Sequence, residues 1–155
     1  MTRMTQARTR AIFTFLIWGS VMLAFTIVFF FSGGGPGHYH LEQWRRIAGG
    51  VIIAFGFAAY YGMMFLTCNR PRTAGVAADE RDEDIRRRAN GTGFIVVLLY
   101  VFLLAIYLWE RYQGTGLVPV GWMWFLAYST SFAAYISSSI GALILESKAS
   151  RRGQS

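Results

Sequence analysis

The sequence has few cysteines, lysines, prolines and histidines, and these shortages narrow the possibilities. Cys68 is the only cysteine, so no disulfide can form within the chain. The three prolines, Pro36, Pro71 and Pro119, lie outside the long apolar runs or in a first turn. Proline breaks the interior of a helix, so its absence there leaves each run free to be helical throughout.

Recognisable catalytic groups are also lacking. The chain contains no zinc-binding HExxH sequence, no phosphate-binding glycine-rich loop and no serine-histidine-acid set. No Asp, Glu, Lys, Arg or His lies in the middle of an apolar run, whereas proton-coupled carriers normally bury such a residue within a span. We therefore predict that the protein is not an enzyme, has no cofactor and is not a drug/proton exchanger.

What the sequence does contain is four long apolar runs. They cover approximately residues 11–32, 47–67, 93–112 and 118–145, and a charged segment at 68–92 separates the second from the third. About 20 apolar residues in a helix cross a hydrocarbon core of roughly 30 Å. The sequence predicts an all-α fold, a bundle of four transmembrane helices in one membrane domain that covers residues 1–155.

The basic residues predict the orientation of these helices. Of the 15 Lys and Arg residues, twelve lie in the N-terminal segment, the 68–92 loop and the C-terminal segment, and the other two loops hold only Arg45, Arg46 and Arg111. Cytoplasmic loops carry an excess of Lys and Arg, so both termini and the 68–92 loop are expected in the cytoplasm. This pattern favours a bacterial cytoplasmic (inner) membrane location and explains the net charge of +7 without nucleic-acid binding.

Small residues recur at helical spacing on two spans. Close approach of small residues is a main cause of helix association in lipid. Each stripe predicts either packing within the chain or contact with a second copy or a larger partner. The stripe residues are Gly50, Ala54, Ala58 and Gly62 on the second span and Ala134, Ser138 and Gly141 on the fourth.

The 68–92 loop carries the most distinctive segment of the chain. Acidic residues come first and arginines follow, an order that suits the dipole of a short helix. Three acid–arginine pairs are spaced i to i+4, and Asn90-Gly91 is a plausible C-cap. The segment is either a solvated helix that enforces topology or a docking element for a cytoplasmic partner or anionic lipid headgroups. The candidate docking residues are Asp79, Glu80, Arg81, Asp82, Glu83, Arg86, Arg87 and Arg88.

Part of this segment resembles a known motif. The run Asp79-Glu80-Arg81-Asp82, followed by Ile85 and Ala89 ahead of the third span, is similar to the Asp-Glu-Arg-Asp-x-x-Ile-x-x-x-Ala motif of a family of small, uncharacterised prokaryotic multi-span membrane proteins. The arginines at 86–88 depart from that pattern. The resemblance implies a membrane location and a four-span fold, and it implies no activity.

Two histidines in the first outer loop offer the best metal donors. His38, His40 and Glu42 alternate along the chain and could bind zinc or copper if the segment were extended. The glycines at 33–37 make the loop flexible, and a third firm ligand is missing. We therefore expect ordinary loop polarity here and predict no metal site.

These patterns leave three classes of function. The leading hypothesis is a non-enzymatic accessory, scaffolding or regulatory membrane protein, whose partners are the lipid bilayer and either a second copy or a larger membrane complex. The alternative is a small transporter or channel, formed by oligomers and lined by the hydroxyl groups of the fourth span. A membrane enzyme acting on lipid or quinone lacks candidate acid and base groups.

Overall fold

The computed structural model of the chain is all-helical, as predicted. It describes residues 6–31, 36–39, 41–68 and 76–152. Four of the helices are long and apolar enough to cross a membrane, and a short 3-10 turn precedes the second. In chain order they are α1 (Gln6–Phe30), η1 (Pro36–His38), α2 (Gln43–Cys68), α3 (Val76–Tyr112) and α4 (Gly121–Arg152).

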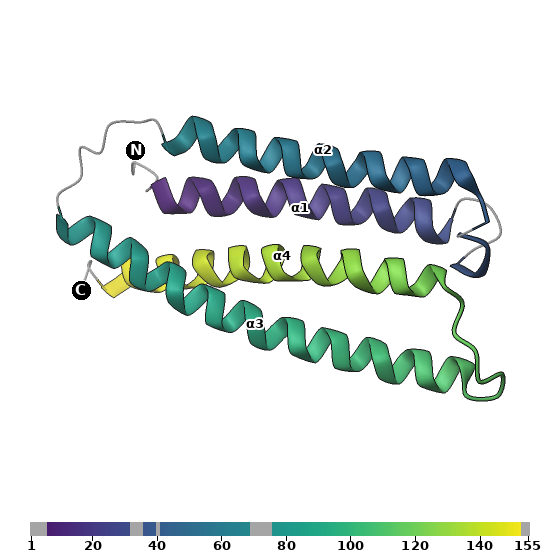
Figure 1. Ribbon diagram of the computed structural model, residues 1–155. Coiled ribbons are helices and arrows are strands. Elements are labelled where there is room, and N and C mark those ends of the chain that lie inside the picture. Colours follow the sequence, from purple (N-terminus) through teal and green to yellow (C-terminus); the bar gives the residue numbers. More distant parts are fainter. Residues whose placement is uncertain (1–5, 32–35, 40, 69–75, 153–155) are drawn as a thin grey trace.

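The four long helices lie in the spatial order α2, α1, α4, α3 (Figure 1). Helix α1 packs against both α2 and α4, and α3 packs chiefly against α4. Helices α2 and α3 follow one another in the sequence but lie at opposite edges of the molecule (Figure 1). The fold therefore consists of two helical hairpins, α1–α2 and α3–α4, which meet mainly along α1 and α4.

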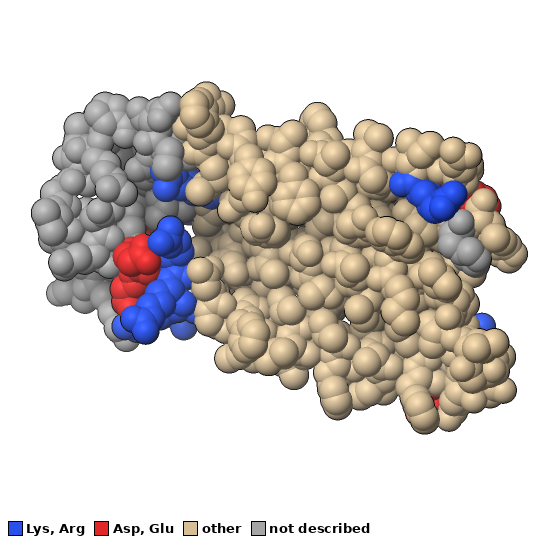
Figure 2. Space-filling view, viewed as in Figure 1, with Lys and Arg blue, Asp and Glu red and all other residues tan. Residues whose placement is uncertain are grey.

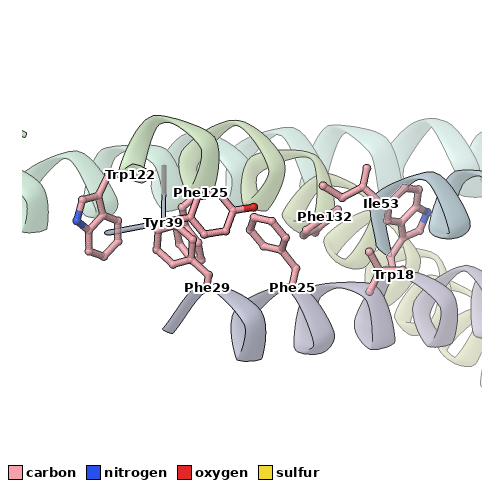
Figure 3. Packing of buried hydrophobic residues seen from close by; sticks show 9 residues of the cluster. Trp18, Phe25, Phe29, Tyr39, Ile53, Trp122, Phe125 and Phe132 are labelled. Carbon is pink, nitrogen blue, oxygen red and sulfur yellow. The ribbon is translucent and has the colours of Figure 1, made fainter. Parts of the chain in front are cut away.

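Aromatic side chains fill the seam between the hairpins (Figure 3). Trp18 of α1 is fully buried and its ring stacks on Tyr135 of α4, with centroids 4.5 Å apart and planes 5° apart. Nearer the other end, Phe25 and Phe29 of α1 pack against Phe125 of α4. Each large ring buries much apolar area and paired rings add roughly 0.5–1.5 kcal/mol, so these contacts fix how the two hairpins meet.

The contact between α1 and α2 depends on two glycines that sequence reasoning passed over. A Cβ added to Gly56 would lie 2.7 Å from Cγ2 of Val21, and one added to Gly49 would collide with the hydroxyl of Tyr39. Both glycines are buried, as is Ile53 between them. Helix α2 therefore approaches α1 through Gly49, Ile53 and Gly56.

The small-residue stripe expected on α2 lies elsewhere. Gly50, Ala54, Ala58 and Gly62 are all exposed, and a Cβ on either glycine would meet no atom within 4 Å. Packing of this stripe within the chain, one of its two expected roles, is therefore not what the structure contains. The physical reason is the rotation of α2 about its axis. Gly49 and Gly56 already face α1, so the stripe that begins one residue later, at Gly50, faces away from it.

Helix α3 begins well before its apolar run. It has 37 residues, and the charged segment forms its first turns without a break before the apolar run. At 1.5 Å per residue the helix is roughly 55 Å long, well beyond a hydrocarbon core of about 30 Å. The predicted C-cap at Asn90-Gly91 is wrong, since both residues lie inside the helix. Ala89 and Gly93 are both buried, so packing holds the backbone helical across the Asn-Gly step.

Helices α3 and α4 come closest near their cytoplasm-facing halves in the predicted topology. A Cβ on Gly93 would collide with Oγ of Ser138, and a Cβ on Gly141 would lie 3.3 Å from Cα of Ala89. The Ser137 hydroxyl lies 3.4 Å from the carbonyl oxygen of Gly93. Two of the small residues expected on the fourth span, Ser138 and Gly141, thus lie against α3.

The surface divides into three zones along the helices (Figure 2). Lys, Arg, Asp and Glu gather at the two ends of the visible face, and the zone between them is free of charge. Large apolar side chains are exposed in the apolar parts of the helices, among them Leu23 of α1 at 64%, Phe55 of α2 at 74% and Leu103 of α3 at 64%. Exposed apolar area on this scale is unusual in a soluble monomer and suits contact with lipid.

Candidate functional site

The charged start of α3 is the first candidate site. Glu83, Asp84, Arg86, Arg87 and Arg88 are all exposed on the helix surface. The side chains of the remaining candidates, Asp79, Glu80, Arg81 and Asp82, lie outside the part of the chain whose side chains the structure describes. The described ionic side chains therefore lie on a helix that continues without a break into the apolar run.

Ion pairs organise these side chains. Arg88 binds Asp84 at 3.0 Å with the predicted spacing of four residues. Glu83 binds Arg86 at 2.7 Å with a spacing of three, where the sequence had suggested Arg87. All four partners are more than half exposed, so each pair contributes only roughly 0.2–1 kcal/mol to stability. The pairs arrange charge on the surface more than they stabilise the fold.

The other positions of the quoted motif have a packing role. Ala89 is 2% exposed and contacts Gly141 of α4, and Ile85 lies one turn earlier and is half-buried. Residues four apart share a helix face, so Ile85, Ala89 and Gly93 form one line toward α4. The opposite side of the same turns carries the ionic groups. The segment is thus an amphipathic helix that packs on α4 and presents its charges outward.

The hydroxyl groups of α4 are satisfied mainly within that helix. Ser129, Thr130 and Ser139 each donate to the carbonyl four residues earlier, at 2.5, 2.6 and 2.7 Å. Ser137 donates to Ala133 at 2.6 Å. Ser129, Ser137 and Ser139 are buried in protein. These hydroxyls therefore do not line a passage within the single chain. Ala134, the remaining residue of α4 that was expected to pack against another helix, is half-buried.

A second site at the other end of the molecule centres on Arg45. This arginine, in the first turn of α2, has no exposed surface. Its Nη2 donates to the carbonyl of Phe29 at 2.6 Å and to that of Val28 at 3.2 Å, and Nε lies 3.3 Å from the Val28 carbonyl. The last carbonyls of a helix have no partner within it and carry partial negative charge. Arg45 therefore caps α1 from the neighbouring helix.

Two further side chains, those of Glu42 and Tyr39, complete this capping site. Glu42 lies 3.8 Å from Nη1 of Arg45, and the ring of Tyr39 lies 5.4 Å from its guanidinium carbon. Tyr39 is 3% exposed and fits over Gly49, which has no Cβ to obstruct its hydroxyl. Burial raises the pKa of the Tyr39 hydroxyl above its ordinary 10.0 and Tyr128 adds to this, while Arg45 and Arg46 lower it. The hydroxyl is thus neutral at physiological pH.

The loop that carries the two histidines is not extended at His38, as metal binding by alternating residues would have required. His38 ends the turn η1 and is exposed, Tyr39 points inward, and Glu42 is paired with Arg45. His40 lies outside the described residues. Within the described part of the chain, no group of three metal-binding side chains is found.

Sequence reasoning missed the capping site because it counted arginines only by loop. One signal was available in the sequence. Helix α1 has no basic residue in its last turn, and α2 has two arginines, Arg45 and Arg46, in its first turn, so one of them can reach the last carbonyls of α1.

Comparison of the chain with protein-family models, curated proteins and solved structures gives no match. The geometry of the two sites is therefore the basis for any functional argument.

Proposed function

We propose that this protein is a non-enzymatic integral membrane protein of the bacterial cytoplasmic membrane, which acts as an accessory or regulatory subunit through a docking surface at the start of α3. In this proposal both termini and the start of α3 lie in the cytoplasm. The arginine distribution supports that orientation. The observation that carries the proposal is that the charged segment and the third span form one helix.

A docking role makes physical sense of that arrangement. An isolated charged helix of three turns would be marginal in water. Here the segment is held by its continuity with the span and by the burial of Ala89 against α4. Its ionic groups are therefore presented at fixed positions, and a partner with complementary charges loses little of its binding free energy in ordering them. Topology alone would need only the net positive charge.

Self-association is a second part of the proposal. The exposed residues Gly50, Ala54, Ala58 and Gly62 permit the backbone of another helix to come close, and α2 lies at an edge where α1 is its main neighbour. We infer that a second copy packs there through the same stripe. The oligomeric channel is less well supported, because the α4 hydroxyls that would line it are largely bonded to their own helix.

The test is co-purification from membranes in a mild detergent, followed by mass spectrometry of the proteins that elute with the full chain. The variant Glu83→Arg with Arg86→Glu exchanges the observed pair and keeps the net charge. The matched control exchanges Glu110 and Arg111 at the other end of α3, where both are exposed. A defined partner should be lost from the first variant alone. Equal recovery of the same proteins with both variants would contradict docking at the start of α3.

A further inference from the structure

A groove opens between the start of α2 and the start of α4. Its volume is about 390 Å³ and it is lined by Gln43, Arg46, Ile47 and Trp124. All four residues are exposed, Ile47 to 57% and Trp124 to 46%. Gln43 and Arg46 place the groove at the start of α2, where polar residues meet the apolar Ile47. It is separate from the docking surface, which lies at the opposite end.

Arg46 and its neighbour Arg45 have opposite environments. Arg45 turns inward and caps α1, whereas Arg46 is exposed and its guanidinium makes no hydrogen bond or ion pair with any residue that the structure describes. The chain thus leaves one cation with free donors at the mouth of an open groove. Guanidinium groups match the geometry of phosphate oxygens and can donate two hydrogen bonds to them.

The walls of the groove suit the rest of a lipid molecule. Ile47 and Trp124 provide apolar area, and the Trp124 ring stacks on Tyr128 one turn further into the apolar zone, with centroids 5.6 Å apart. An acyl chain descending from Arg46 would therefore lie along Ile47 and the ring of Trp124.

We propose that this groove binds one phospholipid, with the headgroup phosphate on Arg46 and Gln43 and an acyl chain along Ile47 and Trp124. Tryptophan is favoured at this depth because its ring is apolar and its N–H is polar. The proposal rests on the membrane insertion proposed above, but it does not depend on the orientation or on the docking surface. The lipid would join the starts of α2 and α4 on the outer surface, in addition to Tyr39, which packs against both Gly49 of α2 and Gly121 of α4.

The experiment titrates the purified full chain in mild detergent with phosphatidylglycerol and measures bound lipid by native mass spectrometry. In Arg46→Gln the first lipid should bind about three- to fivefold more weakly, the range expected for one exposed charge pair. Arg111→Gln is the matched control, since Arg111 is exposed at the same end of the molecule but does not line the groove. Its affinity should equal that of the wild type.

Two further arms separate headgroup binding from general adhesion. Diacylglycerol, which has the same chains without phosphate, should bind the wild type no better than phosphatidylglycerol binds Arg46→Gln. Trp124→Leu should weaken lipid binding while leaving the arginine in place. Equal affinity of all variants, or an equal loss in Arg111→Gln, would overturn the site. Failure of insertion would be distinguished, since the chain would then be missing from the membrane fraction before any titration.

Discussion

The guanidinium of Arg45 donates a 2.6 Å hydrogen bond to the backbone carbonyl of Phe29, and so links the first turn of α2 to the last turn of α1. A fully buried charge is costly unless it is well bonded, and here helix-end carbonyls and Glu42 together provide the bonding. This link joins the two helices of the first hairpin at its closed end. Gly49, one turn further along α2, leaves room for the Tyr39 hydroxyl because it has no Cβ.

The first prediction removes this cap. Arg45→Met keeps much of the side-chain length but leaves the carbonyls of Val28 and Phe29 without their donor. We expect a loss of about 2–3 kcal/mol in the free energy of unfolding, the range for hydrogen bonds from a charged group. Arg46→Met, one residue on and exposed, should change it by less than about 0.5 kcal/mol. Denaturant unfolding in detergent micelles measures both, and equal midpoints would rule out a capping role.

The second prediction concerns the crossing of α3 and α4. In Gly93→Ala the new methyl collides with the Ser138 hydroxyl and lies 3.3 Å from the Ser138 backbone nitrogen. Overpacking of this kind costs about 1–3 kcal/mol. Gly91→Ala, two residues earlier on the same helix, meets open space and should gain up to about 1 kcal/mol from helix propensity. Thermal denaturation should move in opposite directions for the two variants, and a common shift would mean that the crossing is not close-packed.

The third prediction separates the two faces of α2. Gly56→Ala places a methyl 2.7 Å from Val21 and 3.6 Å from Trp18, so it should destabilise the monomer by about 1–3 kcal/mol. Ala58→Leu lies on the exposed stripe and should leave monomer stability unchanged while weakening self-association. Crosslinking in membranes measures the second effect. If Ala58→Leu crosslinks as well as the wild type, the stripe contacts lipid and α2 is not a dimer face.

The fourth prediction concerns orientation. Leu41 is 66% exposed and Arg87 is exposed at the other end of the molecule, so single cysteines at these positions should both be reactive. Tyr39 would be a poor reporter because it is buried. In a Cys68→Ser background, an impermeant maleimide applied to intact cells should label Leu41→Cys and spare Arg87→Cys until the cells are opened. The opposite pattern would invert the proposed topology.

The sequence predicted the four long helices but not the continuity of α3. Apolar runs of about 20 residues identify the four helices because a run of that length can bury itself only in lipid or in a large core. The continuity of α3 could not be read, because Asn90-Gly91 is a local stop signal that burial of Ala89 and Gly93 overrides. Local propensity is weaker than packing at such a position.

The packing face of α2 was undecidable for a related reason. Gly49 with Gly56, and Gly50 with Ala54, both lie at spacings that bring small residues to one face. Only the bulk of the partner selects between them, and here Val21, Phe25 and Tyr39 are seated against the first pair. The role of Arg45 could not be predicted for the same reason, because its hydrogen bonds to the carbonyls of Val28 and Phe29 depend on how α1 and α2 pack together.

The spatial order α2, α1, α4, α3 has a consequence for how the molecule can be assembled. Helices α2 and α3 make few contacts with the hairpin to which they do not belong, and the contact between Tyr60 of α2 and Tyr135 of α4 is one of these few. Each hairpin therefore has its own helix–helix interface. Trp18 and its aromatic neighbours then act as a joint between two finished halves. We therefore expect that two fragments made separately, cut between α2 and α3, retain the α1 and α4 surfaces through which the two hairpins associate.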